Sequence, residues 1–331
     1  MNNNLGFFLS KITEMGGIDL HAHSTASDGS YTPEQLLDLA KSNKLNFIAL
    51  TDHDTIQGYQ NIIEHFSTID SYLAEYYCSA KQNILNQQNP YKSQTFDFEA
   101  GLLWLAKQAK YGKLIDSPIL IPGVELSVIF ENQEIHLLAY YSGQEIELLD
   151  DFLEEQRVAR YKRNLELIQR VNDLGFPIPE NELDPSPEQP VTGRVKIAKW
   201  LVANNYVNSI QQAFNDYLAE GKPAYVPRQR VELEYALQLI DQSNGFPVIA
   251  HPHQYGWCDN HTLLTEKITK IANLANIGVE AFHSNASLEQ QKMIFSLAEK
   301  LKLPFTAGSD FHGTNKEDHQ LYSLNYKPIV F

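Results

Sequence analysis

Residues 17–24 read GIDLHAHS, and this stretch decides the class of fold. An apolar run of strand length ends in two histidines, His21 and His23, which are separated by one residue. Because side chains i and i+2 of a strand point to the same side, both imidazoles face one direction where the strand ends. Such a pair suits two nitrogen ligands of one metal ion, although two histidines at a strand end are equally compatible with an ordinary polar surface.

Short apolar runs of this kind recur along the chain and alternate with amphipathic helical stretches. This alternation is typical of α/β proteins. The predicted strands are residues 17–20, 47–51, 119–122, 135–139, 247–250, 278–282 and 305–307. The predicted helices are residues 33–42, 99–111, 149–174, 195–204, 210–218, 232–242 and 288–301. We therefore expect an α/β fold.

Two segments interrupt the alternation. Residues 60–98 are polar and rich in Gln and Asn, so we expect a helical insertion and a loop there. Residues 143–232 are mostly helical and lie between two predicted strands, as an inserted helical subdomain would. The length of the chain suits one barrel with an insertion. The predicted organisation is a barrel domain formed by residues 1–142 and 233–331, with the helical subdomain inserted into it.

The composition limits the partners and the compartment of the protein. The chain of 331 residues is 43% hydrophobic and carries a formal net charge of −15. This balance argues against binding of long nucleic acid, which needs a basic surface, but it permits a short anionic substrate. The sequence has no apolar run of membrane-spanning length and no secretory leader pattern, so we expect a cytoplasmic protein without a membrane partner. Its two cysteines form no CxxC pair, which argues against a thiolate zinc site.

Residues that can ligate a metal follow or interrupt five further apolar runs. The motifs are TDHD at 51–54, PGVELS at 122–127, IHLLAY at 135–140, AHP at 250–252 and GSDFHG at 308–313. Each motif has an ordinary explanation by itself, since a lone Glu is usually solvated and a His in an apolar run is usually a hydrogen-bonded core residue. Together they indicate a site, because α/β proteins build their sites at strand ends and six of the eleven histidines fall there. A mixture of imidazole and carboxylate ligands suits Mn, Fe or Zn.

The motifs HAHS and SDG, followed in order by these five, resemble the signature of the polymerase and histidinol phosphatase (PHP) family. The resemblance extends from about residue 18 to residue 313. It implies a distorted (β/α)7 barrel that holds three divalent metal ions, with manganese expected and iron or zinc as alternatives. The implied ligands, all present in this chain, are His21, His23, Asp28, His53, Glu125, His136, His251, Asp310 and His312.

The resemblance also divides these ligands among three ions and implies a mechanism. The first ion is held by His21, His23, Glu125 and Asp310, the second by Glu125, His136 and His251, and the third by Asp28, His53 and His312. The expected reaction is hydrolysis of a phosphate monoester by a metal-bridged hydroxide. Candidates for proton transfer are Asp310, His253 and His283. For the two histidines, the alternative is a solvated position or a position that only supports a ligand.

One branch of the family is favoured. Residues 192–198, 213–218 and 221–227 resemble the helical insertion of 3′,5′-nucleotide bisphosphate phosphatases, a group that includes short-RNA 5′→3′ exonucleases. Two features depart from the pattern: residues 60–98 are longer than the usual link, and the usual GRPH reads GRVK at 193–196. The resemblance implies a phosphoric ester hydrolase whose substrate is a small phosphorylated nucleotide or a short oligonucleotide.

Arginines of the predicted subdomain are candidates for a second phosphate anchor. Arg157, Arg160 and Arg163 recur at every third position of one predicted helix, and Arg194 follows a glycine. Arginine binds phosphate through two parallel hydrogen bonds, and we expect this contact above all from Arg160 and Arg194. For Arg157 and Arg163, an equal alternative is a solvated helix face that pairs with nearby glutamates.

Two other functions stay open on the sequence alone. One is a phosphatase of another small metabolite such as histidinol phosphate, which the helical insertion disfavours. The other is a non-catalytic module that binds metal or a polymerase partner, which the complete set of ligands disfavours. The oligomeric state, the exact substrate, the identity of the metals and the role of residues 60–98 are open as well.

Overall fold

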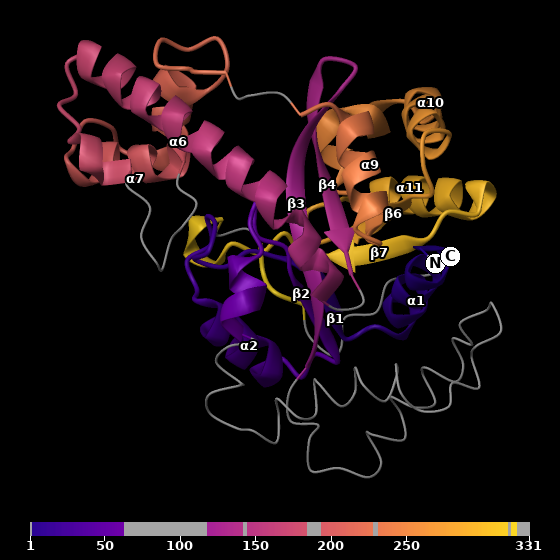
Figure 1. Cartoon of the computed structure of the whole chain (residues 1–331). Helices are drawn as coiled ribbons and strands as arrows, with labels where there is room; N and C mark the ends of the chain where they lie inside the picture. Colours follow the sequence, from indigo (N-terminus) through magenta and orange to yellow (C-terminus); the bar gives the residue numbers. More distant parts are fainter. Residues whose placement is uncertain are drawn as a thin grey trace.

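A computed structural model of the chain describes residues 2–62, 118–141, 144–183, 193–227, 231–316 and 319–322. Seven strands form one sheet in sequential order (Figure 1). They are β1 (Ile18–Ala22), β2 (Phe47–Leu50), β3 (Ile119–Phe130), β4 (Gln133–Tyr140), β5 (Phe246–Ile249), β6 (Gly278–His283) and β7 (Phe305–Gly308). All seven lie where the sequence predicts strands, which confirms the α/β class.

The two edges of the sheet meet, so that the sheet nearly closes into a barrel. An isolated parallel bridge joins Ala22, at the end of β1, to Phe311, which follows β7. The backbone N–H of His23 donates to the carbonyl of Phe311 at 2.8 Å. The carboxyl ends of β1 and β7 are therefore adjacent, and the motifs that follow these strands share one edge of the barrel.

Strand β4 reverses direction within a sheet whose other strands run parallel. It pairs antiparallel with β3 on one side and with β5 on the other. The β3–β4 connection consists of Glu131 and Asn132, whose φ values are 49° and 66°. Positive φ at both positions is the backbone of a type I′ turn, which joins antiparallel strands. The resulting register places His136 opposite Ser127, two residues beyond Glu125. This reversal gives the expected barrel its distortion.

Among the residues that the structure describes, five α-helices surround the sheet (Figure 1). They are α1 (Asn2–Met15), α2 (Pro33–Ser42), α9 (Leu233–Gln242), α10 (His261–Ala272) and α11 (Leu288–Leu301). Capping boxes at Thr32 and Ser287 begin α2 and α11, and both helices have the predicted bounds. Helix α1 is not among the predicted helices; it packs on β5 and β7 through buried side chains such as Leu9 and Ile12. Helix α10 is not among them either, although Asn260 caps it.

The inserted segment forms a second cluster of helices beside the barrel (Figure 1). Its elements are η1 (Gln144–Leu149), α6 (Asp150–Asp173), η2 (Glu180–Leu183), α7 (Arg194–Ala203), α8 (Ile210–Ala213) and the π-helix η3 (Phe214–Leu218). The amino-terminal part of α6 packs on the barrel through Phe152 and Leu153, whereas Leu167 and Val171 belong to a separate apolar core shared with α7. The bounds of the subdomain at 143 and 232 stay a prediction.

Several short segments complete the described chain. Three 3-10 turns are η4 (Pro252–Tyr255), η5 (Trp257–Asp259) and η6 (Gly313–Asn315). The predicted helix at 99–111 lies outside the described residues, and so does the predicted insertion at 60–98 apart from its first three positions. Within the described ranges, no helix is long and apolar enough to cross a membrane.

Candidate metal centre

The two histidines of the opening motif face one glutamate and one aspartate. His21 Nε2 lies 3.3 Å from Glu125 Oε1, and His23 Nε2 lies 3.1 Å from Glu125 Oε2. Both nitrogens also approach Asp310 Oδ1, at 3.5 and 3.3 Å. All four residues are buried, and they come from the ends of β1 and β7 and from β3. The structure thus brings together the four residues implied for a first ion.

The carboxylate of Glu125 is also the meeting point of three further histidines. His136 Nδ1 and His251 Nε2 lie 2.8 and 3.1 Å from Oε1. His53 Nδ1 lies 3.1 Å from Oε2. Both oxygens of this fully buried carboxylate are therefore surrounded by imidazole nitrogens, which is the arrangement a bridging ligand needs.

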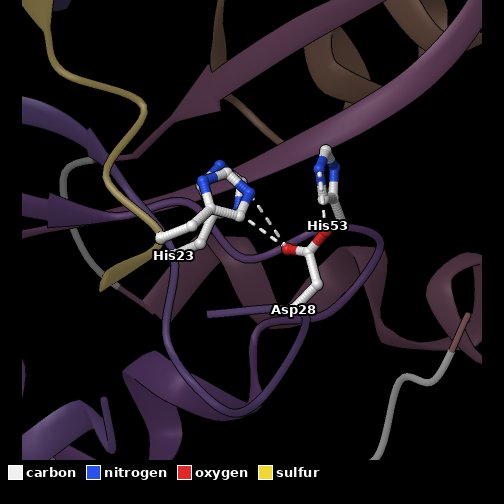
Figure 2. Close-up of side chains that lie close together, drawn as sticks. His23, Asp28 and His53 are labelled. Atoms are coloured by element: carbon white, nitrogen blue, oxygen red, sulfur yellow. Dashed lines mark ion pairs between the residues drawn. The ribbon is translucent and has the colours of Figure 1, made fainter. Parts of the chain in front are cut away.

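A third group surrounds Asp28, which follows β1 in a loop. Figure 2 shows its carboxylate between His23 and His53, with each separation 3.9 Å. His312 Nε2 lies 3.2 Å from Asp28 Oδ1. The ligand atoms of all four residues lie within 4.8 Å of one another. His53 therefore lies between this group and Glu125, rather than in the third group alone.

The spacing and the unpaired atoms both fit bound divalent ions. Two ligand atoms at about 2.1 Å from one ion lie about 3.0–3.5 Å apart, which is close to the separations observed here. A buried polar atom without a partner is costly, and native structures rarely keep one. Among the described residues, five ligand atoms are buried without a hydrogen-bond partner: His21 Nε2, His23 Nε2, His53 Nδ1, Glu125 Oε2 and His312 Nε2.

The electrostatics of the centre favour ionised carboxylates. Burial opposes the ionisation of Glu125, but His53, His136 and His21 hold the pKa of this carboxyl well below its usual range. Burial likewise opposes the ionisation of Asp310, and Lys316 and the neighbouring histidines hold its pKa well below the usual range. The carboxylates are therefore ionised at neutral pH and available to a cation.

The histidines divide into two kinds. Burial lowers the pKa of His53 and His251, which leaves them neutral and able to bind a cation. Burial also disfavours the charged form of His23, but the carboxylates of Asp310 and Glu125 raise its pKa to about 9. These carboxylates thus attract positive charge to this side of the centre, where a metal ion would replace the proton of His23.

Two buried aspartates that the sequence analysis did not single out fix the loops of the centre. Asp52 accepts hydrogen bonds from the backbone N–H of Ser24 and from the hydroxyls of Ser24 and Ser27, each at 2.7 Å. It thereby shapes the loop that carries Asp28. Asp19 accepts from the backbone N–H of Ser309, at 3.0 Å, and so ties β1 to the segment that carries Asp310. Asp19 lies within the apolar run of β1, and Asp52 lies in the TDHD motif after the apolar run of β2; these positions were the available signals.

A cavity lies between the candidate metal centre and the helical subdomain, and residues of both line it. Its barrel side includes Asp28, His53 and His136. Of the described residues, five cationic ones line its subdomain side: Arg160, Arg163, Arg194, Lys196 and Lys199. These cationic side chains face the carboxylates and imidazoles across the cavity. Although the protein is acidic, they make the cavity locally attractive to anions.

Three of the four predicted arginines line this cavity. Arg160 contacts the carboxylate of Asp54, and Arg163 is buried. The guanidinium of Arg194 lies 5.8 Å from the ring centroids of both Phe214 and Tyr225, which hold it in place through cation–π contacts.

The fourth arginine, Arg157, is not brought to the cavity. Its guanidinium pairs with Glu154 at 2.7 Å, as the alternative of a solvated helix face describes. Two cavity lysines, Lys196 and Lys199, are absent from the sequence predictions. They are three residues apart on α7 and therefore share a helix face, which was the available signal for them.

The two histidines proposed for proton transfer lie next to each other, outside the cavity. The ring centroids of His253 and His283 are 4.6 Å apart. Burial lowers the pKa of His253 to about 4 and that of His283 to about 3, so both are neutral at pH 7. Neither lines the cavity, and their part in proton transfer stays a prediction.

A further group with ligand-like spacing contains His283, Asp310 and His319. The backbone N–H of Asn285 donates to His283 Nδ1 at 3.1 Å, so the neutral ring carries its proton on Nε2. A protonated nitrogen cannot bind a metal ion. On the same side, the ammonium of Lys316 lies 2.8 Å from Asp310 Oδ2. This group therefore does not suit a cation.

The PHP domain family matches residues 19–292 of this sequence. The chain belongs to the PHP domain family. The 5′-3′ exoribonuclease Rnm of Escherichia coli strain K12 is 29% identical to it, over 89% of this chain and 84% of the relative. The 3′,5′-nucleoside bisphosphate phosphatase of Chromobacterium violaceum is 27% identical, over 90% of this chain and 88% of the relative.

The fold comparison agrees with the sequence comparison. A Bifidobacterium adolescentis structure, described as a candidate metal-dependent phosphoesterase, is similar with a TM-score of 0.66. It is 24% identical and covers 92% of this chain and 90% of its own. The PHP resemblance, the distorted barrel and the enzyme class, a phosphoric ester hydrolase, are thereby confirmed. Membership of this family implies divalent metal ions as cofactors.

Proposed function

We propose that this chain hydrolyses phosphate esters of 3′,5′-bisphosphate nucleotides or short oligonucleotides at a centre of three divalent metal ions. The observation that carries the proposal is the cavity, which among the described residues has three predicted ligands, Asp28, His53 and His136, on one side and five cationic side chains on the other. The exoribonuclease and the bisphosphate phosphatase among its relatives support a nucleotide substrate.

The three groups of ligands would hold the ions. In this assignment Glu125 would serve two of the ions, because its oxygens contact five histidines from separate strands and loops. Manganese is the expected metal, since imidazole and carboxylate ligands together suit it, and iron or zinc are alternatives. When bound, such ions lower the pKa of water and neutralise phosphoryl oxygens.

The residues of the chain itself orient the substrate. Arg160 and Arg194 present guanidinium groups that suit the two oxygens of a phosphate. We assign them to a second phosphate of the substrate, with Arg163 beside them and the ester to be cleaved at the ligand groups. Asp310 is the proton-transfer candidate that lies in the centre, because one oxygen faces His21 and His23 while the other faces Lys316.

Product analysis tests this proposal. Purified protein loaded with Mn²⁺ is incubated in parallel with a 3′,5′-bisphosphate nucleotide, a short 5′-labelled RNA, histidinol phosphate and an aryl phosphate. We expect the first two to be the preferred substrates, and inorganic phosphate and a nucleoside monophosphate to appear in equal amounts from the bisphosphate. Preference for histidinol phosphate would instead indicate a metabolite phosphatase. Bound metal without turnover of any ester would indicate a non-catalytic module.

A further inference from the structure

Glu280 is a buried carboxylate on β6 that contacts two of the proposed metal ligands without belonging to their set. Its Oε1 lies 3.1 Å from His21 Nδ1. Its Oε2 accepts the backbone N–H of His251 at 2.7 Å. Each oxygen thus serves a different ligand, and the two ligands belong to two different metal groups.

We propose that Glu280 is a positioning residue, which sets the tautomer of His21 and the backbone of His251 so that both rings present a lone pair to the metal centre. An ionised carboxylate only accepts hydrogen bonds, so His21 Nδ1 must carry the proton. With a metal ion in place of the second ring proton, the lone pair would be on Nε2, the atom that faces Glu125 and Asp310. The inference rests on the proposed metal centre.

The same carboxylate holds a strained backbone. His251 has φ 27° and ψ 56°, which lies in the left-handed region that a residue with a side chain rarely adopts. Such a conformation persists only where its surroundings fix it, and the hydrogen bond from the His251 N–H to Glu280 is one such restraint. The strained turn brings His251 Nε2 to 3.1 Å from Glu125 Oε1.

Gly308, at the end of β7, packs directly against His21 and Glu280. A Cβ atom added there would lie 2.3 Å from His21 Cβ and 2.5 Å from Glu280 Oε1, which no real Cβ does. The backbone of β7 therefore approaches the His21–Glu280 pair as closely as a glycine permits. This packing leaves no space for a side chain at position 308 beside the His21–Glu280 pair, and it explains the glycine of the GSDFHG motif.

The variant Glu280→Gln separates this role from bulk packing. Its shape is the same, but one of its two terminal atoms becomes an N–H donor, while both partners, His21 Nδ1 and His251 N, are donors themselves. Either the His21 tautomer is inverted or the His251 turn loses its restraint. Loss of such a supporting partner typically weakens metal affinity by about 10- to 100-fold.

The test measures the dissociation constant for Mn²⁺ by equilibrium dialysis, together with the thermal unfolding temperature. Tyr140→Phe is the matched control, because it removes a buried hydrogen bond to the carbonyl of Leu20, next to His21, without touching a ligand ring. We expect Glu280→Gln to bind Mn²⁺ about 10- to 100-fold more weakly and Tyr140→Phe to bind it within twofold of wild type. Equal affinity of Glu280→Gln and wild type, or equal weakening in both variants, would overturn the inference.

A measurement on the wild-type protein covers the case in which Glu280→Gln does not fold. Correlation spectra of ¹⁵N-histidine in Zn²⁺-loaded protein are expected to show a proton on His21 Nδ1. An unprotonated Nδ1 would reject the role of Glu280. The outcome for the proposed function is separate, since wild-type protein that binds no divalent ion would reject the metal centre itself.

Discussion

The barrel side and the subdomain side of the cavity carry different kinds of side chain, which are held in different ways. On the barrel side, short side chains such as His21 and Glu125 extend from strands and are fully buried. On the subdomain side, long side chains such as Arg194 and Lys199 extend from a helix and rest on protein neighbours. The strands thus place the proposed ligands in fixed positions, whereas the helices place cationic side chains along the facing side of the cavity.

The largest expected effect comes from Glu125, which the proposed metal-ligand groups share. Glu125→Gln removes the charge that five histidines surround, so we expect loss of bound metal and a fall in kcat of about a thousandfold or more. Metal content and phosphate release are the measurements. Glu131→Gln, in the exposed β3–β4 turn, is the control and should keep both. If Glu125→Gln kept activity within tenfold of wild type, the barrel side of the cavity would not be the part on which catalysis depends.

Removal of the metal should affect the two sides unequally. An ion present at 100 to 1,000 times its dissociation constant stabilises the folded state by about 2.7 to 4.1 kcal/mol. Chelation should therefore lower the stability of the barrel and increase amide hydrogen exchange at the ends of β1 and β7. Exchange in α7 should change little, because its apolar core is separate from the barrel core. Equal increases in both regions would show that the metal does not belong to the barrel alone.

The cationic side chains on the subdomain side of the cavity should affect substrate binding rather than the rate of the hydrolytic step. Arg194→Ala removes a cationic side chain of the cavity, so we expect KM for a 3′,5′-bisphosphate to rise by about 10- to 100-fold, as for loss of a hydrogen bond between charged groups. KM for an aryl phosphate, which has no second phosphate, should stay nearly constant. Equal increases for the two substrates would reject the anchoring role.

A smaller effect concerns the pH dependence of stability. His253 has a folded pKa of about 4, lowered by burial, against about 6.5 in an unfolded chain. Between pH 6.5 and 4, His253 is protonated in the unfolded chain but neutral in the folded chain. The free energy of unfolding is therefore highest above pH 6.5 and decreases as the pH falls toward 4. The slope from one such group is at most about 1.4 kcal/mol per pH unit.

Urea unfolding between pH 4.5 and 7.5, with chelator in all samples, measures this slope. His253→Gln should flatten it, whereas His261→Gln, at the exposed start of α10, should leave it unchanged. An identical slope in all three proteins would show that His253 is not buried as a neutral group.

The smallest effect is expected from Arg157, which shares α6 with Arg160 but pairs with Glu154 away from the cavity. Exposed ion pairs contribute about 0–1 kcal/mol, so Arg157→Ala should change the free energy of unfolding little. KM for the bisphosphate should stay within twofold of wild type. A rise as large as that of Arg194→Ala would place Arg157 in the substrate site after all.

The barrel side was largely predictable from the sequence because its geometry is dictated by topology. Parallel strands end at one edge of a sheet, so polar residues after apolar runs, such as His21, His251 and Asp310, must gather there. The same logic fails at β4, whose reversal depends on two turn residues, Glu131 and Asn132, that carry no strong turn signal.

Other features were not accessible to sequence reasoning for physical reasons. Glu280 contacts His21 across 259 positions, and no local pattern reports such a pairing. The arginines of α6 differ by their angle around the helix axis, so a spacing of three does not reveal that Arg160 faces the cavity and Arg157 does not. Helix α1 follows from packing on β5 and β7 rather than from a strong amphipathic pattern.

The central claim is that ligands distant in the sequence bind divalent ions together at the barrel mouth. Anomalous diffraction at the manganese edge, from crystals of Mn²⁺-loaded protein, measures this directly. We predict peaks within bonding distance of the Glu125 carboxylate, of Asp310 with His21 and His23, and of Asp28 with His312. Manganese located elsewhere, with these side chains unliganded, would contradict the account.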